Sequence, residues 1–327
     1  MKTKETLKQF CEALKANDHF LLTCHVSPEG DSIGSILAMD SLLRRLGKKT
    51  TVVCDDPFPE RLFCLSDKRW HQTDEIKKSR SQFKTLVVAD CPTLDRIGKV
   101  QKLLKSETAI FNIDHHISNV GFGDHNYVRP EAAACAEVVV EIFKYFSLPF
   151  TKEEAKNLYV ALSTDTGSFK YSNTTVRCHH VAAELIASGI NIEKINEELY
   201  STYSLNKLQL YSYLLARVKT ALDGQIAWVG LRREDLRRSQ TTYEDTEGFI
   251  DFLKFLREVK VVFFMSETEH PNEVKVSFRS KGSYDVNKIA THFRGGGHKK
   301  ASGCAIPTSL AKAEKLILDR VQKEFRK

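Results

Sequence analysis

The sequence has no long apolar run, no Cys-x-x-Cys pair, no internal repeat and no low-complexity tract. A membrane-spanning helix needs about 20 consecutive apolar residues, so no segment is expected to cross a membrane. The polar residues 1–8 do not resemble the start of a signal peptide, which favours a cytoplasmic protein. Eight scattered cysteines are typical of reduced core thiols rather than of a disulfide framework.

The length of 327 residues is too great for one ordinary core and predicts about two domains. Apolar residues make up 42% of the chain and charged residues 28%, as in ordinary soluble globular proteins. The net charge of +7 fits a polyanionic partner, but lysine and arginine are spread along the expected helices and the C-terminal tail. Charge alone therefore does not identify a nucleic-acid surface.

Apolar strand patterns and helical patterns alternate through the first part of the chain. Strands are expected at residues 20–24, 49–54, 85–90 and 109–114, and helices at residues 6–16, 31–46, 61–65, 99–105, 135–146, 153–163, 176–188 and 192–200. This alternation predicts a parallel sheet with crossover helices.

The pattern changes after Asp223-Gly224. A long helix at residues 205–221, without metal-ligand residue types, is expected to connect two domains. Further elements are expected beyond it, with strands at 225–231, 259–265 and 273–279, helices at 247–257 and 286–292, and a charged helical tail after Pro307. The sequence thus predicts an α/β fold with an N-terminal parallel-sheet domain (1–190), a helical linker (191–222) and a smaller α/β domain (223–327).

Carboxylates and imidazoles follow several of these apolar elements. The apolar run from Ile110 ends in Asp114-His115-His116, and three further elements end in the same kind of residue. Open α/β sheets bind ligands at the carboxyl ends of their strands. The residues gathered there are His25, Glu29, Asp31, Asp90, Asp114, His115, His116 and Asp165.

A single residue of this set has an ordinary structural explanation, because a lone aspartate commonly caps a helix and a lone histidine commonly satisfies a local hydrogen bond. Many carboxylates at one edge would repel one another without cations. Carboxylates with imidazoles suit Mn²⁺ or Mg²⁺, with Zn²⁺ or Fe²⁺ as alternatives. Two ions roughly 3.5–4 Å apart activate water and neutralise a phosphoryl group, which indicates phosphoester or phosphoanhydride hydrolysis.

A glycine run, Gly295-Gly-Gly-His298, lies near the C-terminus, and by itself it is a weak signal. It follows a segment rich in lysine and arginine and ends in a histidine. This context indicates backbone close to a ligand, with a cationic or donor group on a phosphate.

Seven segments together resemble the DHH phosphoesterase superfamily, in the stand-alone branch of nano-RNases and 3′-phosphoadenosine-5′-phosphate (pAp) phosphatases. Four resemble the motifs of the catalytic domain: His25-Val-Ser-Pro-Glu-Gly-Asp31-Ser-Ile-Gly-Ser35, Val88-Ala-Asp90, Asp114-His-His116 and Ser163-Thr-Asp165-Thr-Gly167. Three resemble the DHH-associated domain: Val276-Ser-Phe-Arg-Ser280, Asp285-Val-Asn-Lys-Ile-Ala290 and Gly295-Gly-Gly-His298-Lys-Lys-Ala-Ser-Gly303. The resemblance covers nearly the whole chain and implies an active site in the cleft between the two domains.

The resemblance also implies roles for individual residues. The first metal would be held by His25, Glu29 and Asp90, and the second by Asp31, Asp90, His115 and Asp165. His116 would face the substrate phosphate, and Asp114 would orient the histidine pair, which gives Asp90, Asp114, His115 and His116 as the catalytic group. Substrate would be bound by His116, Arg279, Gly295, Gly296, Gly297 and His298.

The function expected from the resemblance is hydrolysis of very short oligoribonucleotides to mononucleotides, with pAp as a further substrate. The expected cofactors are two divalent ions, Mn²⁺ first and Mg²⁺ or another ion as the alternative. Short RNA or nucleotides are the expected partners. No obligate protein partner is indicated, and a homodimer is left open.

The sequence departs from the family pattern at two places. Glu29 stands where the family usually has aspartate, which lengthens the ligand by one methylene. Ala132-Ala-Ala-Cys135 stands where relatives often carry hydroxyl residues.

Two other functions stay open at this stage. A cyclic-dinucleotide phosphodiesterase would share the same motifs, and Glu29 raises the alternative of a non-catalytic nucleotide sensor. Family II inorganic pyrophosphatases share the first four motifs but lack the Gly-Gly-Gly-His signature, and RecJ-type exonucleases are usually longer.

Overall fold

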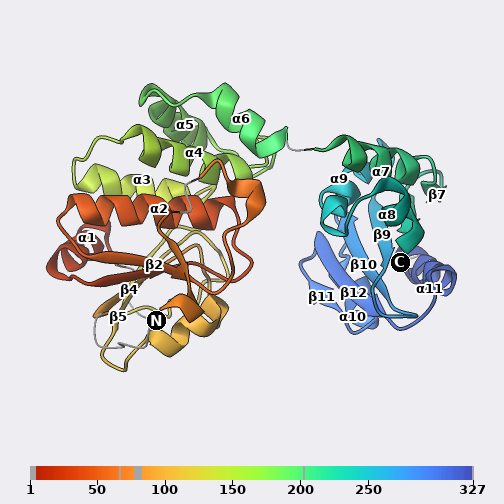
Figure 1. Ribbon diagram of the computed structural model, residues 1–327, viewed down its shortest axis with the longest axis horizontal. Coiled ribbons are helices and arrows are strands. Elements are labelled where there is room, and N and C mark those ends of the chain that lie inside the picture. The colour runs from red at the N-terminus through yellow and green to blue at the C-terminus, as the bar shows by residue number, and fades with distance from the viewer. Residues whose placement is uncertain (1–4, 66–67, 77–82, 202, 326–327) are drawn as a thin grey trace. The chain divides into compact units, whose positions relative to one another are not determined.

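The structure, a computed structural model, describes residues 5–65, 68–76, 83–201 and 203–325. Contacts within the chain divide it into two compact units, Met1–Thr202 and Tyr203–Lys327 (Figure 1). Each unit has its own sheet and its own apolar core, which confirms the α/β class. The predicted domain boundaries at residues 190 and 222 stay predictions.

The first unit contains a six-stranded sheet in which all neighbouring strands are parallel, as predicted. Across the sheet the strands are β3 (Trp70–Gln72), β2 (Thr50–Cys54), β1 (Phe20–Thr23), β4 (Thr85–Ala89), β5 (Ala109–Asp114) and β6 (His125–Val128). The four central strands are the predicted ones, and they read as apolar runs because both faces of the sheet are covered. The edge strands β3 and β6 were not predicted.

Alternate residues of the central strands enter two different cores. Leu22 and Phe111 belong to the larger core, and Leu21 and Val88 to the smaller one. Six helices contribute to the larger core: α1 (Leu7–Ala16), α2 (Gly30–Arg45), α3 (Cys135–Tyr145), α4 (Lys152–Asp165), α5 (Val176–Ala187) and α6 (Ile192–Tyr200). Of these, α4, α5 and α6 lie farther from the strands (Figure 1). The short 3₁₀ segments are η1 (Glu60–Leu62), η2 (Thr73–Glu75) and η3 (Leu94–Leu103), and η3 covers the smaller core.

The helix predicted at residues 99–105 is helical only as far as Leu103 and is not an α-helix. The chain instead forms η3, a 3₁₀ segment interrupted at Gly98, which has a φ of 61°. Oδ2 of Asp55 accepts a hydrogen bond of 3.0 Å from the backbone nitrogen of Lys99, directly after this interruption. A Cβ at position 98 would lie 2.4 Å from the same oxygen, so the turn requires glycine.

Helix α2 approaches α4 through two glycines. A Cβ at Gly34 would lie 2.2 Å from the carbonyl oxygen of Asn157, and a Cβ at Gly30 would lie 2.3 Å from Oγ1 of Thr164. The missing side chains allow the two helices to pack closely. The start of α2, which carries Asp31, therefore lies beside the end of α4, which carries Asp165.

The second unit contains a six-stranded sheet in which only β8 and β9 pair in parallel. Across this sheet the strands are β11 (Gly296–Gly297), β12 (Ala301–Ile306), β10 (Val274–Ser280), β9 (Val261–Glu267), β8 (Ile226–Leu231) and β7 (Lys219–Ala221). The core on one face includes α10 (Asn287–His292) and α11 (Leu310–Phe325). The core on the other includes α7 (Leu205–Leu215), α8 (Arg233–Ser239) and α9 (Phe249–Leu253), with η4 (Glu244–Thr246) nearby.

The long connecting helix predicted at residues 205–221 is confirmed for residues 205–215 and wrong beyond them. Helix α7 ends at Leu215, and Lys219–Ala221 forms the edge strand β7. Arg217 follows α7 and donates from Nη1 and Nη2 to Asp235, over 3.0 and 2.6 Å, which ties the chain to α8 at this turn. The helix predicted at 247–257 is shorter than expected and spans only Phe249–Leu253. Among the described residues, no helix has the length and apolarity needed to cross a membrane.

Replacing Gly34 by alanine is expected to destabilise the first unit. The added methyl group would overlap the Asn157 carbonyl at the α2–α4 contact, and overpacking of this kind costs about 1–3 kcal/mol. Greater helix propensity offsets at most about 1 kcal/mol of this cost. The midpoint of thermal unfolding should fall by about 2–4 °C per kcal/mol of net loss. Gly296→Ala is the control, because nothing lies within 4 Å of its added Cβ, and equal midpoints for the two variants would contradict the prediction.

Candidate metal centre

The carboxyl ends of three neighbouring strands bring Asp90 between two histidines. Asp90 follows β4, His25 follows β1 and His115 follows β5. Nε2 of His25 lies 3.6 Å from Oδ2 of Asp90, and Nε2 of His115 lies 3.4 Å from Oδ1. The predicted gathering of strand-end residues at this edge of the sheet is thus present in the structure.

The ends of two helices add further carboxylates. Oδ2 of Asp31, at the start of α2, and Oδ2 of Asp165, at the end of α4, lie 3.6 and 3.7 Å from Nε2 of His115. Asp31 accepts hydrogen bonds from the backbone nitrogens of Cys135 (2.6 Å) and Ala136 (3.0 Å) at the N-terminus of α3. Unpaired N–H groups at a helix start stabilise a carboxylate in this position.

Backbone carbonyls orient two of the histidines. Nδ1 of His25 lies 2.8 Å from the carbonyl oxygen of Val26, and Nδ1 of His115 lies 3.2 Å from that of Ala132. A carbonyl oxygen only accepts hydrogen bonds, so Nδ1 carries the proton in each contact. The lone pair of the neutral ring is then on Nε2, which faces the carboxylates.

Asp114 holds the two consecutive histidines from a fully buried position. Its Oδ1 accepts hydrogen bonds from the backbone nitrogens of His115 (2.8 Å) and His116 (3.2 Å) and from Nδ1 of His116 (2.7 Å). Its Oδ2 accepts a hydrogen bond of 2.5 Å from the side-chain amide of Asn119. Asn119 was not predicted from the sequence, because this residue lies in a turn and belongs to no periodic pattern.

The potential ligands form three groups, in each of which the ligand atoms lie within 4.8 Å of one another. The groups are His25, Glu29 and Asp90; Asp90, His115 and His116; and Asp31, His115 and Asp165. Glu29 is exposed, yet its carboxylate stays within reach of His25 and Asp90 despite the extra methylene. The structure therefore brings together every residue of the predicted cluster, while their individual roles as ligands stay predictions.

Close packing of these groups shifts their pKa values. Burial, together with the charge of Asp90, raises the pKa of Asp31 well above its usual range. Burial alone would raise the pKa of Asp90, but its contacts with His115 and His25 lower it. Burial alone would lower the pKa of His115, but Asp90 and Asp31 raise it to about 10. Burial raises the pKa of Asp165 to about 6, against the effect of His115.

The cluster fits divalent cations. Oδ1 of Asp90 is buried and, in the described part of the chain, accepts no hydrogen bond. A buried carboxylate oxygen of this kind is costly unless a cation satisfies it. Carboxylate oxygens and imidazole nitrogens are also the donors that Mn²⁺ accepts.

The residues predicted to bind substrate from the second unit lie on and beside its sheet. Arg279 is on β10, Gly296 and Gly297 form β11, and His298 is exposed in the turn that leads to β12. Gly295 has no room for a side chain, because a Cβ would lie 2.1 Å from the carbonyl oxygen of Gly303. Packing on β12 thus explains the glycine at 295, whereas the surroundings of Gly296 are open.

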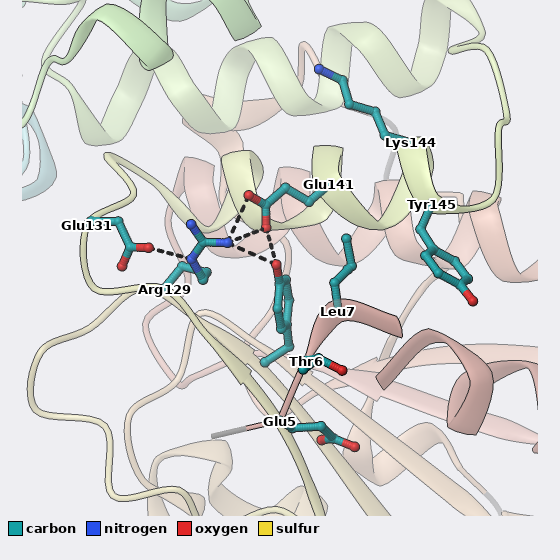
Figure 2. Close-up of a pocket in the computed structure, with 9 residues that line it drawn as sticks. Glu5, Thr6, Leu7, Arg129, Glu131, Glu141, Lys144 and Tyr145 are labelled. Carbon is teal, nitrogen blue, oxygen red and sulfur yellow. Dashed lines mark hydrogen bonds and ion pairs between the residues drawn. The ribbon is translucent and has the colours of Figure 1, made fainter. Parts of the chain in front are cut away.

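A pocket of about 820 Å³ in the first unit contains none of the predicted ligands (Figure 2). Tyr145 and Leu7 line it together with charged side chains that are already paired. Nη1 of Arg129 lies 3.0 Å from both carboxylate oxygens of Glu141, and Nζ of Lys144 lies 2.6 Å from Glu184. The pocket therefore offers no unpaired cation for a phosphate.

Comparisons with known proteins match both units of the chain to known domain families. Residues 19–162 match the DHH family, N-terminal domain, and residues 225–327 match the DHHA1 domain. The chain is similar to the bifunctional oligoribonuclease and PAP phosphatase NrnA of Thermus thermophilus (29% identity, 98% of this chain, 95% of that protein) and of Bacillus subtilis (27%, 92% and 93%). Its fold is similar to that of an exopolyphosphatase-related protein from Bacteroides fragilis, with a TM-score of 0.89 and 26% identity over 99% and 98% of the two chains. Thermus thermophilus RecJ in complex with Mn²⁺ shares the fold at 10% identity, with a TM-score of 0.55 over 98% of this chain and 55% of that one.

Divalent-ion binding to this cluster is expected to release protons. A metal ligand must be an unprotonated imidazole or carboxylate, whereas His115, with a pKa of about 10, holds a proton at neutral pH. Below pH 6 Asp165 also becomes protonated. Affinity for Mn²⁺ should therefore rise with pH between about 6.5 and 8, about tenfold per unit for each displaced proton. Calorimetric titrations in buffers of different ionisation enthalpy count the protons, and a pH-independent affinity would contradict the prediction.

Proposed function

The chain belongs to the DHH family and carries that family's DHHA1 domain, and from this membership we propose that it is a metal-dependent phosphoesterase of short RNA. It hydrolyses very short oligoribonucleotides to mononucleotides and also removes phosphate from pAp. The NrnA proteins to which it is similar over nearly their whole length are named for these two activities.

The placement of Asp90 between His25 and His115 is the observation that supports this function best. A carboxylate with one imidazole on each side can bridge two cations, each completed by the remaining groups. Each position that the resemblance assigns to a metal ligand carries a carboxylate or an imidazole in this chain, and Glu29 replaces the aspartate that the resemblance leads us to expect there.

We infer that His25, Glu29 and Asp90 hold one divalent ion and that Asp31, Asp90, His115 and Asp165 hold a second. The donor set favours Mn²⁺, with Mg²⁺ as the alternative. When bound, such ions acidify a water molecule and neutralise negative charge on a phosphoryl group. Asp90 would contribute to both positions, so its loss would affect both ions.

His116 is the group of the first unit that faces the phosphate in this proposal. Its hydrogen bond to Asp114 raises its pKa, which burial alone would lower. The Nδ1 proton is committed to Asp114, so Nε2–H of the protonated ring is the donor that remains for a phosphoryl oxygen. Asp114 acts as a positioning residue through this contact.

The second unit supplies cationic groups for the substrate. Among residues 203–327, lysine and arginine outnumber aspartate and glutamate by 23 to 15, whereas in the preceding residues the counts are 26 and 27. Phosphate affinity depends mainly on such cations. Arg279 and His298 bind the terminal phosphate, and the backbone at Gly296 and Gly297 lies close to the ligand.

Mononucleotide release from a 5′-phosphorylated diribonucleotide tests this function. Metal-stripped protein should be inactive, and added Mn²⁺ should restore release of mononucleotide, with pAp and cyclic di-AMP tested in parallel. If the protein released no mononucleotide from the diribonucleotide but cleaved cyclic di-AMP, its function would be cyclic-dinucleotide turnover. If the protein hydrolysed none of these substrates, it would be a non-catalytic sensor. Hydrolysis by the Glu29→Asp variant would then show that the longer side chain of Glu29 causes the loss of activity.

Asp90→Ala should reduce Mn²⁺-dependent kcat by at least about 100-fold, because ion-mediated stabilisation is worth several kcal/mol. Steady-state hydrolysis of the diribonucleotide measures the effect. Asp319→Ala, an exposed position on α11, is the control. Normal turnover by Asp90→Ala would contradict the site assignment.

His298→Ala should raise KM for the diribonucleotide by about tenfold with little change in kcat, because one charge-assisted hydrogen bond to the substrate is lost. His180→Ala, exposed on α5, serves as the matched control. A loss confined to kcat would place His298 at the reacting group rather than at a binding position.

A further inference from the structure

The segment that follows Asp165 at the end of α4 has an unusual backbone. Gly167, Ser168 and Phe169 have φ values of 55°, 58° and 63°. Three consecutive residues in the left-handed region are rare, and only the first of these three is a glycine. Conformations of this kind cluster at functional sites, where the surrounding structure holds them in place.

Thr166, which is fully buried, holds this turn. Its carbonyl oxygen accepts hydrogen bonds of 3.0 Å from the backbone nitrogens of Lys170 and Tyr171. Its Oγ1 accepts a hydrogen bond of 3.1 Å from the backbone nitrogen of Phe169. The ring of Tyr171 lies over Gly167, because a Cβ at position 167 would overlap it. These contacts return the chain toward the end of α4.

The turn places the side chain of Asn173 between two segments. Its Nδ2 donates a hydrogen bond of 3.1 Å to the carbonyl oxygen of Asp165 and one of 2.9 Å to the carbonyl oxygen of Ala133. An amide nitrogen carries two hydrogens and a carbonyl oxygen only accepts, so each contact uses one donor. A single side chain thus joins the end of α4 to the segment that leads into α3.

Both segments carry or orient groups that are predicted to hold the second ion. Asp165 is itself one of the four predicted ligands. In the segment before α3, the carbonyl oxygen of Ala132 lies 3.2 Å from Nδ1 of His115. The backbone nitrogen of Cys135 donates a hydrogen bond of 2.6 Å to Asp31. The amide therefore links the backbone supports of three of the four ligands.

Ala133 is held from its other side as well. Its backbone nitrogen donates a hydrogen bond of 3.2 Å to Oε1 of Glu137, a fully buried carboxylate whose Oε2 lies 2.9 Å from Nε of Arg177. Oδ1 of Asn173 is buried and, among the described residues, accepts no hydrogen bond. An unpaired buried oxygen is unfavourable, so the contacts that favour an amide at position 173 are the two bonds from Nδ2.

We propose that Asn173 is a positioning residue for the second divalent-ion position and fixes the separation of Asp165 from His115. The inference rests on the proposed function and deepens it. Nε2 of His115 lies 3.7 Å from Oδ2 of Asp165, so a small shift of either backbone changes the space between them. Metal affinity depends on the hydrogen bonds that orient the ligands. Loss of the amide weakens the second ion and leaves the first position intact, with its ligands His25, Glu29 and Asp90.

Binding of Mn²⁺ to the metal-stripped full chain tests this role without any substrate. A calorimetric titration should detect two ions per chain in the wild type. Asn173→Ala should weaken one of them by about 10–100-fold, the usual cost of losing a group that orients a metal ligand. The other ion should weaken by less than about threefold. Asn173→Leu, which keeps a side chain of similar size without any donor, should give the same result.

Two further variants separate positioning from a general loss of stability. Asn191→Ala is the matched control, because Asn191 caps α6 with a hydrogen bond of 3.0 Å from the backbone nitrogen of Lys194. Its loss destabilises the same unit and should leave both ions unchanged. Asp165→Ala removes a predicted ligand of the second ion. Adding Asn173→Ala to it should weaken that ion by less than about threefold further, because the two residues act on one position.

Electron paramagnetic resonance of the same samples supplies an independent readout. Two Mn²⁺ ions about 3.5–4 Å apart couple magnetically, so the wild type with two equivalents should give a coupled spectrum. Asn173→Ala at the same loading should give the spectrum of isolated ions.

Several results would overturn the inference. These are wild-type Mn²⁺ affinity in both Asn173 variants, an equal loss in Asn191→Ala, failure of both Asn173 variants to fold without metal, and a wild type that binds a single ion. The proposed function is judged separately by hydrolysis. A protein that binds two ions with the help of Asn173 but cleaves no substrate loses the function and keeps this inference, and one that cleaves the diribonucleotide without needing Asn173 does the reverse.

Discussion

The buried carboxylate of Asp90 is the group on which the arrangement of the first unit depends. Asp90 is 2% exposed, and within the described chain one of its oxygens accepts no hydrogen bond. Such a group is stable only beside compensating positive charge, of which His25 and His115 supply a part from the two neighbouring strands. Its φ of 56° is uncommon for a residue other than glycine, and conformations of this kind cluster at functional sites. The strand ends around Asp90 are therefore constrained by charge as well as by packing.

Main-chain groups provide much of the support for this cluster. The carbonyl oxygen of Ala132 orients His115, and the backbone nitrogens of Cys135 and Ala136 hold Asp31. These contacts of residues 132–136 with the cluster use backbone atoms, so they do not require hydroxyl side chains. This explains how the chain tolerates three consecutive alanines beside a charged site. The side chains of Ala133, Ala134 and Cys135 are buried in the larger core, which leaves little room for larger residues in this segment.

The sequence predicted the centre of the first sheet and the members of the cluster, because both follow from local patterns. The central strands are mostly apolar, and each ends in or is closely followed by a carboxylate or an imidazole. The edge strands β3 and β6 are short and partly exposed, so they show no such run. Asn119 could not be predicted, because its bond to Asp114 depends on the shape of a turn. The helix expected at residues 205–221 ends at Leu215, and the chain then contacts α8 through Arg217 and Asp235, a tertiary contact that a local helical pattern does not show.

The two units differ in charge. The carboxylates and imidazoles of the cluster lie in the first unit, and the excess of lysine and arginine lies in the second. The first unit is close to neutral overall and gathers its carboxylates at the cluster, so without bound cations this edge would repel a polyanion. The second unit carries the excess of lysine and arginine, among them Arg279 on β10. A short RNA has few phosphates and gains little from diffuse attraction, so its affinity must come from specific contacts with a phosphate and a base. In the proposed function, the second unit offers such contacts and the first unit holds the groups that bind the cations.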